Sequence, residues 1–114
     1  SFEEYLKQLR EAFSHLEISY FQSNIEGELV NALHKATEDS DGIILNPAAF
    51  THTSVALGDA VKSLDCPLIE VHISNIFQRE EFRNFSYVSS GAIAVISGMG
   101  LRSYELALRY FLPA

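Results

Sequence analysis

The chain has 114 residues, of which 47% are hydrophobic and 20% charged, and its net charge is −7. These values are typical of one globular domain with its own core, and the negative charge excludes a general binder of nucleic-acid backbones. No apolar run is long enough to span a bilayer, and the single cysteine, Cys66, excludes an internal disulfide framework and favours a reducing compartment. We therefore expect one cytoplasmic domain over residues 1–114, with no metal, cofactor, membrane or nucleic-acid partner.

The spacing of apolar residues predicts alternating helices and strands. Ser1 and Glu4 have the spacing of a capping box, so a first amphipathic helix should run to about Ser14. Further helices are predicted over about residues 29–36, 54–64 and 101–111. Strands are predicted over residues 18–22 and 42–47, in the apolar run that begins at Leu68, and over residues 91–98. Strict alternation of this kind predicts an α/β fold with a parallel sheet covered on both faces.

Residues 68–83 combine a predicted strand with several side chains that could carry chemistry. Glu70, His72 and Ser74 are spaced by two, so they should begin on one face of the strand. A carboxylate beside an imidazole can orient a histidine and raise the pKa of the imidazole. Because open parallel sheets bind ligands at the carboxyl ends of their strands, this strand end is a candidate site.

A second polar group follows the preceding strand, where Asn46 and His52 occur. Two histidines at the same ends of neighbouring strands favour a shared site over two separate structural histidines. His15 and His34 fall on or beside helices and should lie at the surface. No catalytic-triad, P-loop or dinucleotide motif occurs, so acid–base chemistry on a polar molecule, or simple binding of one, remains. A Schiff-base mechanism is disfavoured because all the lysines fall in helical patterns, namely Lys7, Lys35 and Lys62.

Three of the candidate residues also have ordinary structural interpretations. Arg83 could simply pair with Glu80 at i,i+3 spacing. Ser74 could cap the turn that follows it. Asp59 lies within a predicted helix, where a charged side chain is normally solvated.

Taken together, these stretches resemble the type II 3-dehydroquinate dehydratases. One matching stretch is the run Glu-Val-His-Ile-Ser-Asn of residues 70–75. Together the stretches cover most of the chain in the family's order and spacing, which is far more specific than any single motif. The other matching stretches are residues 21–24 with 26–28, 41–47, 51–57 and 79–83. The chain departs from the family's usual Gly and Tyr at Ala48 and Phe50, and from its frequent His-Ala at Phe77 and Gln78.

The resemblance implies a flavodoxin-like three-layer sandwich and a homododecamer built as a tetramer of trimers. It implies a hydro-lyase of the shikimate pathway that converts 3-dehydroquinate to 3-dehydroshikimate by anti elimination of water through an enolate. Neither a metal nor a Schiff base takes part in that reaction. His72 matches the general acid, and Glu70 matches the carboxylate that orients it. Matches to substrate-binding positions are Asn46, His52, Asp59 (which would act from a neighbouring subunit), Ile73, Ser74 and Arg83.

The resemblance fails at the front of the chain. The family carries a strand and a lid loop before the first helix, with a tyrosine general base and a lid arginine. No residue of this chain matches either position, and Tyr5, Tyr20 and Tyr87 do not fit the motif. The family's front strand is central, between the strands predicted over residues 18–22 and 42–47. Without it, a gap of about 10 Å would separate those strands.

We therefore expect residues 1–114 to form one flavodoxin-like domain that is N-terminally incomplete relative to the family and inactive by itself. We also expect a further strand in that gap in any structure. The alternative is a non-catalytic homologue that acts as a ligand-binding or assembly subunit. A third hypothesis is a flavodoxin-like regulatory module.

Overall fold

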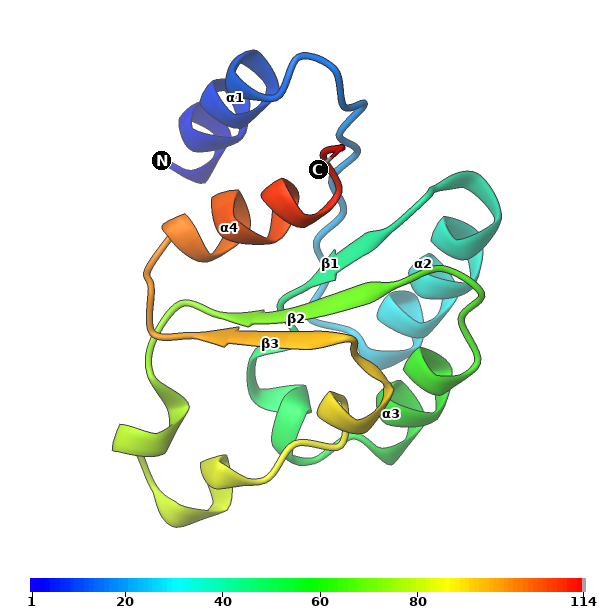
Figure 1. Ribbon diagram of the computed structural model, residues 1–114. Helices are drawn as coiled ribbons and strands as arrows, with labels where there is room; N and C mark the ends of the chain where they lie inside the picture. The colour runs from blue at the N-terminus through cyan, green and yellow to red at the C-terminus, as the bar shows by residue number, and fades with distance from the viewer. Residues whose placement is uncertain (114) are drawn as a thin grey trace.

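The computed structural model describes residues 1–113 and has a three-stranded sheet at its centre (Figure 1). The strands are β1 (Ile43–Leu45), β2 (Leu68–His72) and β3 (Ala94–Ser97), and both neighbouring pairs are parallel. β2 lies in the middle and is buried along its whole length. A strand that is covered on both faces has no solvent side for polar residues, which explains its mainly apolar sequence. The predicted α/β class is confirmed.

Helices cover both faces of the sheet, as Figure 1 shows. Two helices pack on one face, while a third packs on the other face and carries the first helix on its outer side. In chain order they are α1 (Phe2–Ala12), α2 (Glu26–Asp39), α3 (Val55–Lys62) and α4 (Arg102–Tyr110), with α2 and α3 on the first face. Within residues 1–113, no helix is long and apolar enough to cross a membrane.

The helix starts follow from local sequence. The predicted capping box of α1 is present, since the Ser1 side chain accepts from the backbone N–H of Glu4 and the Glu4 side chain accepts from the Ser1 nitrogen. Ser54 caps α3 by accepting from the backbone N–H of Leu57. Each such cap contributes about 1 kcal/mol to helix stability.

Two apolar layers hold the helices on the sheet. Leu57 and Leu68 are buried in the layer under α2 and α3, whereas Leu9, Phe13 and Leu108 join α1 to α4 on the other side. Each fully buried large aliphatic side chain stabilises the fold by about 1.5–3 kcal/mol. Helices therefore pack on both faces of the sheet and hold the carboxyl ends of its strands in place.

The strand predicted over residues 18–22 is wrong, because these residues form an irregular segment. A strand needs a neighbour for its backbone groups. Here the Ile18 carbonyl instead accepts two hydrogen bonds from the Arg10 guanidinium, at 3.1 and 3.0 Å. A groove of about 1180 Å³ lies beside this segment and is also lined by β1 residues and by α1 and α4 side chains. The expected further strand in this gap is absent from residues 1–113, and the groove stands in its place.

Candidate functional site

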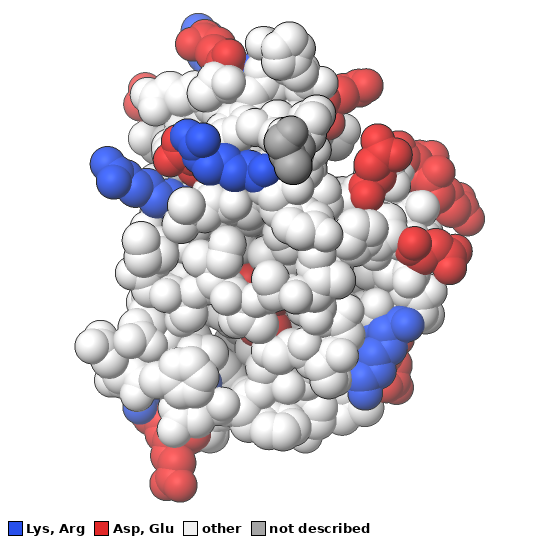
Figure 2. Space-filling view, viewed as in Figure 1, with Lys and Arg blue, Asp and Glu red and all other residues white. Residues whose placement is uncertain are grey.

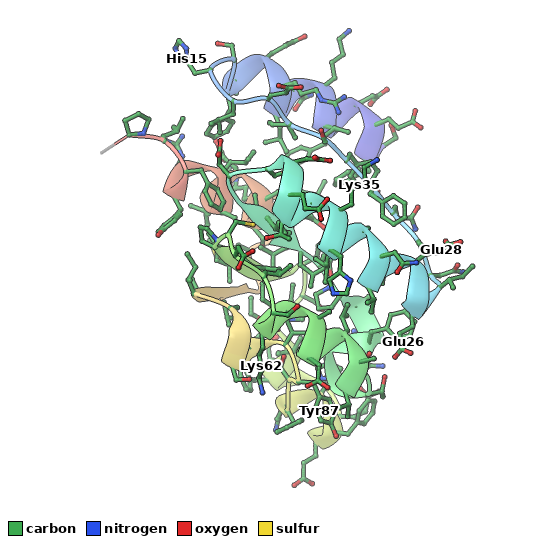
Figure 3. All side chains as sticks on the ribbon, turned by 90° about the vertical axis from the view of Figure 1, so that its right-hand side faces the viewer. His15, Glu26, Glu28, Lys35, Lys62 and Tyr87 are labelled. Atoms are coloured by element: carbon green, nitrogen blue, oxygen red, sulfur yellow. The ribbon has the colours of Figure 1, made fainter. Side chains whose placement is uncertain are left out.

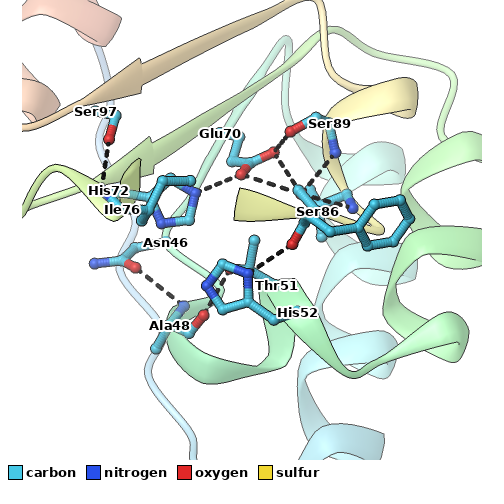
Figure 4. A network of polar contacts seen from close by, with 12 residues as sticks. Asn46, Ala48, Thr51, His52, Glu70, His72, Ile76, Ser86, Ser89 and Ser97 are labelled. Atoms are coloured by element: carbon cyan, nitrogen blue, oxygen red, sulfur yellow. Dashed lines mark hydrogen bonds and ion pairs between the residues drawn. The ribbon is translucent and has the colours of Figure 1, made fainter. Parts of the chain in front are cut away.

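The site is built around a carboxylate and an imidazole on β2. Glu70 and His72 leave the strand on the same face, as their spacing predicts, and His72 Nε2 is hydrogen-bonded to Glu70 Oε2 (Figure 4). Their side chains are 0% and 5% exposed. Because Nε2 is engaged by the carboxylate, Nδ1 is the ring atom that His72 can offer to a ligand.

Two serines complete the surroundings of Glu70. The Ser89 hydroxyl donates to Oε1 at 2.7 Å, and the Ser86 hydroxyl lies 3.3 Å from both carboxylate oxygens. Burial by itself raises the pKa of Glu70, but hydrogen bonds from His72, Ser89 and Ser86, with the His72 charge, hold that pKa below its ordinary value. Glu70 is therefore an anion at neutral pH. Sequence reasoning missed both serines, since no motif links them to a strand 16 and 19 residues upstream.

His52 lies beside His72, as predicted from their positions at the same ends of neighbouring strands. It closes the 3₁₀ helix η1 (Ala48–His52) after β1, and the two imidazole rings are stacked with centroids 6.5 Å apart. His52 Nδ1 lies 2.6 Å from the Phe85 carbonyl oxygen, an acceptor only, so Nδ1 carries a proton. The rings of Phe82 and His52 lie at right angles, with centroids 5.9 Å apart. The structure thus brings the two predicted histidines into one site.

Asn46 is held at the end of β1 by two hydrogen bonds. Its Oδ1 accepts from the backbone N–H of Ala48 at 3.1 Å, and its Nδ2 donates to the Tyr104 hydroxyl at 3.0 Å. Ala48 has φ of 51°, a conformation in which glycine is favoured, and this is the position where the resemblance leads one to expect glycine. Tyr104, from α4, is a contact that sequence reasoning missed. One N–H of Asn46 remains for a ligand.

Arg83 forms the surface pair that its spacing allowed. Its Nε donates to Glu80 Oε2 at 2.7 Å, and Glu80 is 61% exposed, so the pair itself contributes little to stability. Arg83 lies on the 3₁₀ helix η3 (Glu81–Asn84), which packs against η1 beside His52. The pair occupies Nε of the guanidinium. Within residues 1–113, the terminal N–H groups of Arg83 keep no hydrogen-bond partner and can donate to a ligand.

The remaining predicted residues surround the site less closely. Ile73 and Ser74 are exposed just after β2, with their carbonyls accepting from Gly100 N–H and the Ser97 hydroxyl. The suggestion that Ser74 caps the next turn is wrong, because Asn75 caps it by accepting from Phe77 N–H. A cap must precede the first helical residue directly, and η2 (Ile76–Gln78) begins one residue too late for Ser74.

Asp59 stays outside this site. It is exposed on α3, and its side chain forms no hydrogen bond or ion pair with any residue between 1 and 113. His15 and His34 are exposed, as predicted. In the described part of the chain, no group of three or more His, Cys, Asp or Glu side chains could hold a metal ion.

The sequence model of the family described as "Dehydroquinase class II" matches residues 1–112. Curated 3-dehydroquinate dehydratases are similar to the chain. The protein of Bacillus subtilis is 48% identical over 107 residues, covering 94% of this chain and 72% of its own length. That of Aliivibrio fischeri is 56% identical over 93 residues, covering 82% and 62%. For the Bacillus licheniformis protein, identity is 52% over 96 residues, covering 84% and 66%. The chain thus spans roughly two thirds of these relatives, between 62% and 72% of their lengths.

Solved structures agree with the fold and with the sequence match. The type II dehydroquinase of Propionibacterium acnes has a TM-score of 0.86 at 40% identity, covering 91% of this chain and 73% of its own. A 3-dehydroquinate dehydratase-like protein of Bifidobacterium longum has a TM-score of 0.69 at 34% identity, covering 94% and 85%. The match over nearly the whole chain and the agreement in fold lead to one conclusion. The chain belongs to the class II dehydroquinase family.

Proposed function

We propose that the protein is a 3-dehydroquinate dehydratase of the shikimate pathway. The observation that carries the proposal is the buried Glu70–His72 pair, stacked against His52 at the carboxyl edge of the sheet. Asn46 reaches the same edge from β1. The names of the similar curated proteins supply the substrate and the reaction.

The reaction fits acid–base chemistry by His72. The substrate carries a ketone and a hydroxyl group two carbons away. Removal of a proton next to the ketone gives an enolate, which then expels the hydroxyl. His72, oriented by Glu70, protonates that oxygen so that it leaves as water on the face opposite to the removed proton. Positioned acid catalysis of this kind contributes about 10²–10⁴-fold to a rate.

Several of the predicted side chains keep a polar group that can bind a ligand. We propose that Asn46, His52 and Arg83 bind the ring hydroxyls, and that Ile73 and Ser74 hold the substrate carboxylate, partly through backbone N–H groups. Asp59 would serve the site of a neighbouring subunit, consistent with its exposure on α3.

The base is assigned to no tyrosine of residues 1–113. The Tyr5 hydroxyl donates to the Leu101 carbonyl, and the Tyr104 hydroxyl accepts from Asn46. Burial raises the pKa of both Tyr5 and Tyr104, so their phenolate forms are disfavoured at neutral pH. We propose that the base and a lid arginine are supplied by a family segment that these residues do not contain.

We propose that this segment also contributes a strand that fills the groove beside β1. Residues 18–22 line the groove's far side, and within residues 1–113 β1 is paired with β2 only. On this proposal, residues 1–114 form one N-terminally incomplete domain that is inactive by itself. An added parallel strand would give the free edge of β1 the partner that a buried strand needs.

For the assembly, we propose a cytoplasmic homododecamer built from trimers. Several large apolar side chains are exposed around β3 and the turns before it, and the face in Figure 2 carries its charged residues mainly at the margins. Apolar surface of this extent is characteristic of subunit contacts. The exposed side chains are Phe77, Phe82, Phe85, Ile93 and Val95. Native mass spectrometry would test the assembly, since a monomer would contradict it.

The function is tested by turnover of purified 3-dehydroquinate in the complete protein, followed by ultraviolet absorbance of the enone product. His72→Ala should lower kcat by about 10²–10⁴-fold, because the leaving hydroxyl loses its proton donor. His15→Ala is the matched control, since His15 is exposed and far from the site. In Figure 3 it lies at the opposite end of the molecule from Tyr87, whose backbone N–H donates to the carbonyl of Thr51 beside His52.

Unchanged turnover in the His72 variant would remove His72 from the mechanism. No turnover in the complete wild-type protein, together with binding of a hydroxylated carboxylate analogue, would favour the non-catalytic ligand-binding alternative.

A further inference from the structure

One loop supports both histidines of the site. We call residues 85–89, which run from the end of η3 into the start of η4 (Ser89–Gly91), the serine loop. Its Phe85 carbonyl accepts from His52, and the Tyr87 N–H donates to the Thr51 carbonyl at 2.8 Å. Its two serines reach Glu70, the partner of His72 (Figure 4). The loop is thus bonded both to the segment after β1 and to β2.

The Ser86 hydroxyl is arranged to donate toward Glu70. Its oxygen accepts from the backbone N–H groups of Val88 and Ser89, each at 3.0 Å. With both lone pairs engaged, the remaining hydroxyl proton points away from these amides. The Glu70 carboxylate lies in that direction, with its two oxygens equally distant at 3.3 Å.

The Ser89 hydroxyl makes the shorter contact, at 2.7 Å to Oε1 of Glu70. The other oxygen, Oε2, bonds His72. The two carboxylate oxygens therefore have different donors, and the carboxylate cannot rotate without losing one of them. A side chain that is 0% exposed has no water to replace a lost donor.

We propose that Ser86 and Ser89 are positioning residues, which hold Glu70 as an oriented anion and thereby fix His72 with Nδ1 toward the ligand. The inference rests on the proposed function and adds to it the groups that keep the dyad in its working form. If Glu70 took up a proton, it would no longer be an anionic acceptor for the Nε2–H of His72. His72 would then lose its fixed tautomer.

The charges around Glu70 are few. His72 is the titratable group whose charge acts on Glu70 in the described part of the chain. His52 lies beside His72, with ring centroids 6.5 Å apart. Of the neighbouring elements, α3 carries Asp59 and Lys62, and neither forms an ion pair with Glu70 within residues 1–113. The lowered pKa of Glu70 is consistent with the serine contacts.

The test compares Ser89→Ala, the double variant Ser86→Ala/Ser89→Ala, and the control Ser90→Ala in the complete protein. Ser90 is exposed and makes no side-chain hydrogen bond within residues 1–113, so its loss should change nothing. The carboxyl ¹³C signal of Glu70, assigned by its loss in Glu70→Gln, is followed against pH by NMR. We expect its titration to move to higher pH in both test variants, because a donor that favours the anion has been removed.

Activity gives a second readout. The acid limb of the pH–rate profile should move in the same direction, so that kcat at its acid end falls about tenfold, as expected for the loss of a hydrogen bond to a charged group. Ser89→Thr, which keeps the hydroxyl, should restore much of both properties. A purely structural serine would lower activity equally at every pH.

The proposal is overturned if Glu70 titrates at the wild-type pH in both test variants. If the double variant does not fold, the single Ser89→Ala variant decides in the same way. Absence of turnover in the wild-type protein would reject the dehydratase function, yet the NMR titration would still support or overturn the serine contacts by itself.

Discussion

The two sides of β1 differ sharply in how their polar groups are satisfied. Toward β2, Glu70, His72 and His52 each have a hydrogen-bond partner, and no buried side-chain polar atom of residues 1–113 lacks one. On the other side, residues 18–22 pair with no strand in the described part of the chain, and they expose Tyr20 at 51% and Phe21 at 56%. Between them lies the groove.

This difference separates a half of the domain whose buried polar groups have partners within residues 1–113 from a half that carries an open groove. The site side is closed by short contacts among neighbouring loops, so it needs no further chain to satisfy its buried groups. On the groove side, apolar side chains of α1 and α4 line an open groove beside β1, where we propose that a further strand binds. The two sides should therefore respond differently to added segments and to substitutions.

The largest expected effect comes from filling the groove. Residues 1–114 by themselves should be poorly folded or aggregated and should show no dehydratase activity. Joining the proposed family segment, with its strand and lid, in front of Ser1 should raise the free energy of unfolding by several kcal/mol. Each backbone group that gains a partner contributes about 1–3 kcal/mol, against a total of about 5–15 kcal/mol for such a domain. Urea unfolding followed by circular dichroism measures the change.

The matched control places prolines in the middle of the added segment, because proline cannot donate to a strand ladder. A 114-residue chain that melts cooperatively, with residues 18–22 protected from hydrogen exchange by bonding directly to β1, would contradict this prediction.

How much could be predicted from the sequence differs between the two sides in the same way. The apolar runs of β2 and β3 and the i,i+2 spacing of Glu70 and His72 are local signals, and they predict both the strands and the dyad. The parallel direction of the strands also follows from the alternation of elements. For residues 18–22, a strand-like pattern was insufficient, because pairing depends on a neighbour that the pattern does not describe.

The serine loop could not be predicted for a different reason. Ser86 and Ser89 are separated from Glu70 by two 3₁₀ turns whose path no periodicity defines. Tyr104 reaches Asn46 only because α4 crosses the sheet above β1. Such contacts depend on tertiary packing, so composition and spacing carry no signal for them.

A substitution at Gly58, away from the histidines, should disturb the site side. A Cβ at this position of α3 would lie 2.4 Å from the Tyr87 carbonyl oxygen, in the serine loop (Figure 3 shows Tyr87 beside this helix). Gly58→Ala should therefore displace the loop, lower the free energy of unfolding by about 1–3 kcal/mol and reduce kcat. Thermal melts and kinetics measure both effects.

The control for this change is Gly27→Ala in α2, where an added Cβ meets nothing within 4 Å. Alanine there should stabilise the helix by about 0.5–1 kcal/mol and leave kcat unchanged. Equal effects of the two substitutions would show that the close approach of α3 to the serine loop has no consequence for the site.

The smallest expected effect concerns Arg83, on η3 at the edge of the site side. Its Nε is paired with Glu80, which leaves the terminal N–H groups to form two hydrogen bonds to a substrate in fixed geometry. Lysine keeps the charge but is a mobile point donor, so Arg83→Lys should raise KM about tenfold, the equivalent of one hydrogen bond to a charged group. Glu80→Gln should change KM far less, because an exposed pair contributes little. Steady-state kinetics on 3-dehydroquinate separate the two, and wild-type KM in Arg83→Lys would return Arg83 to a purely structural surface pair.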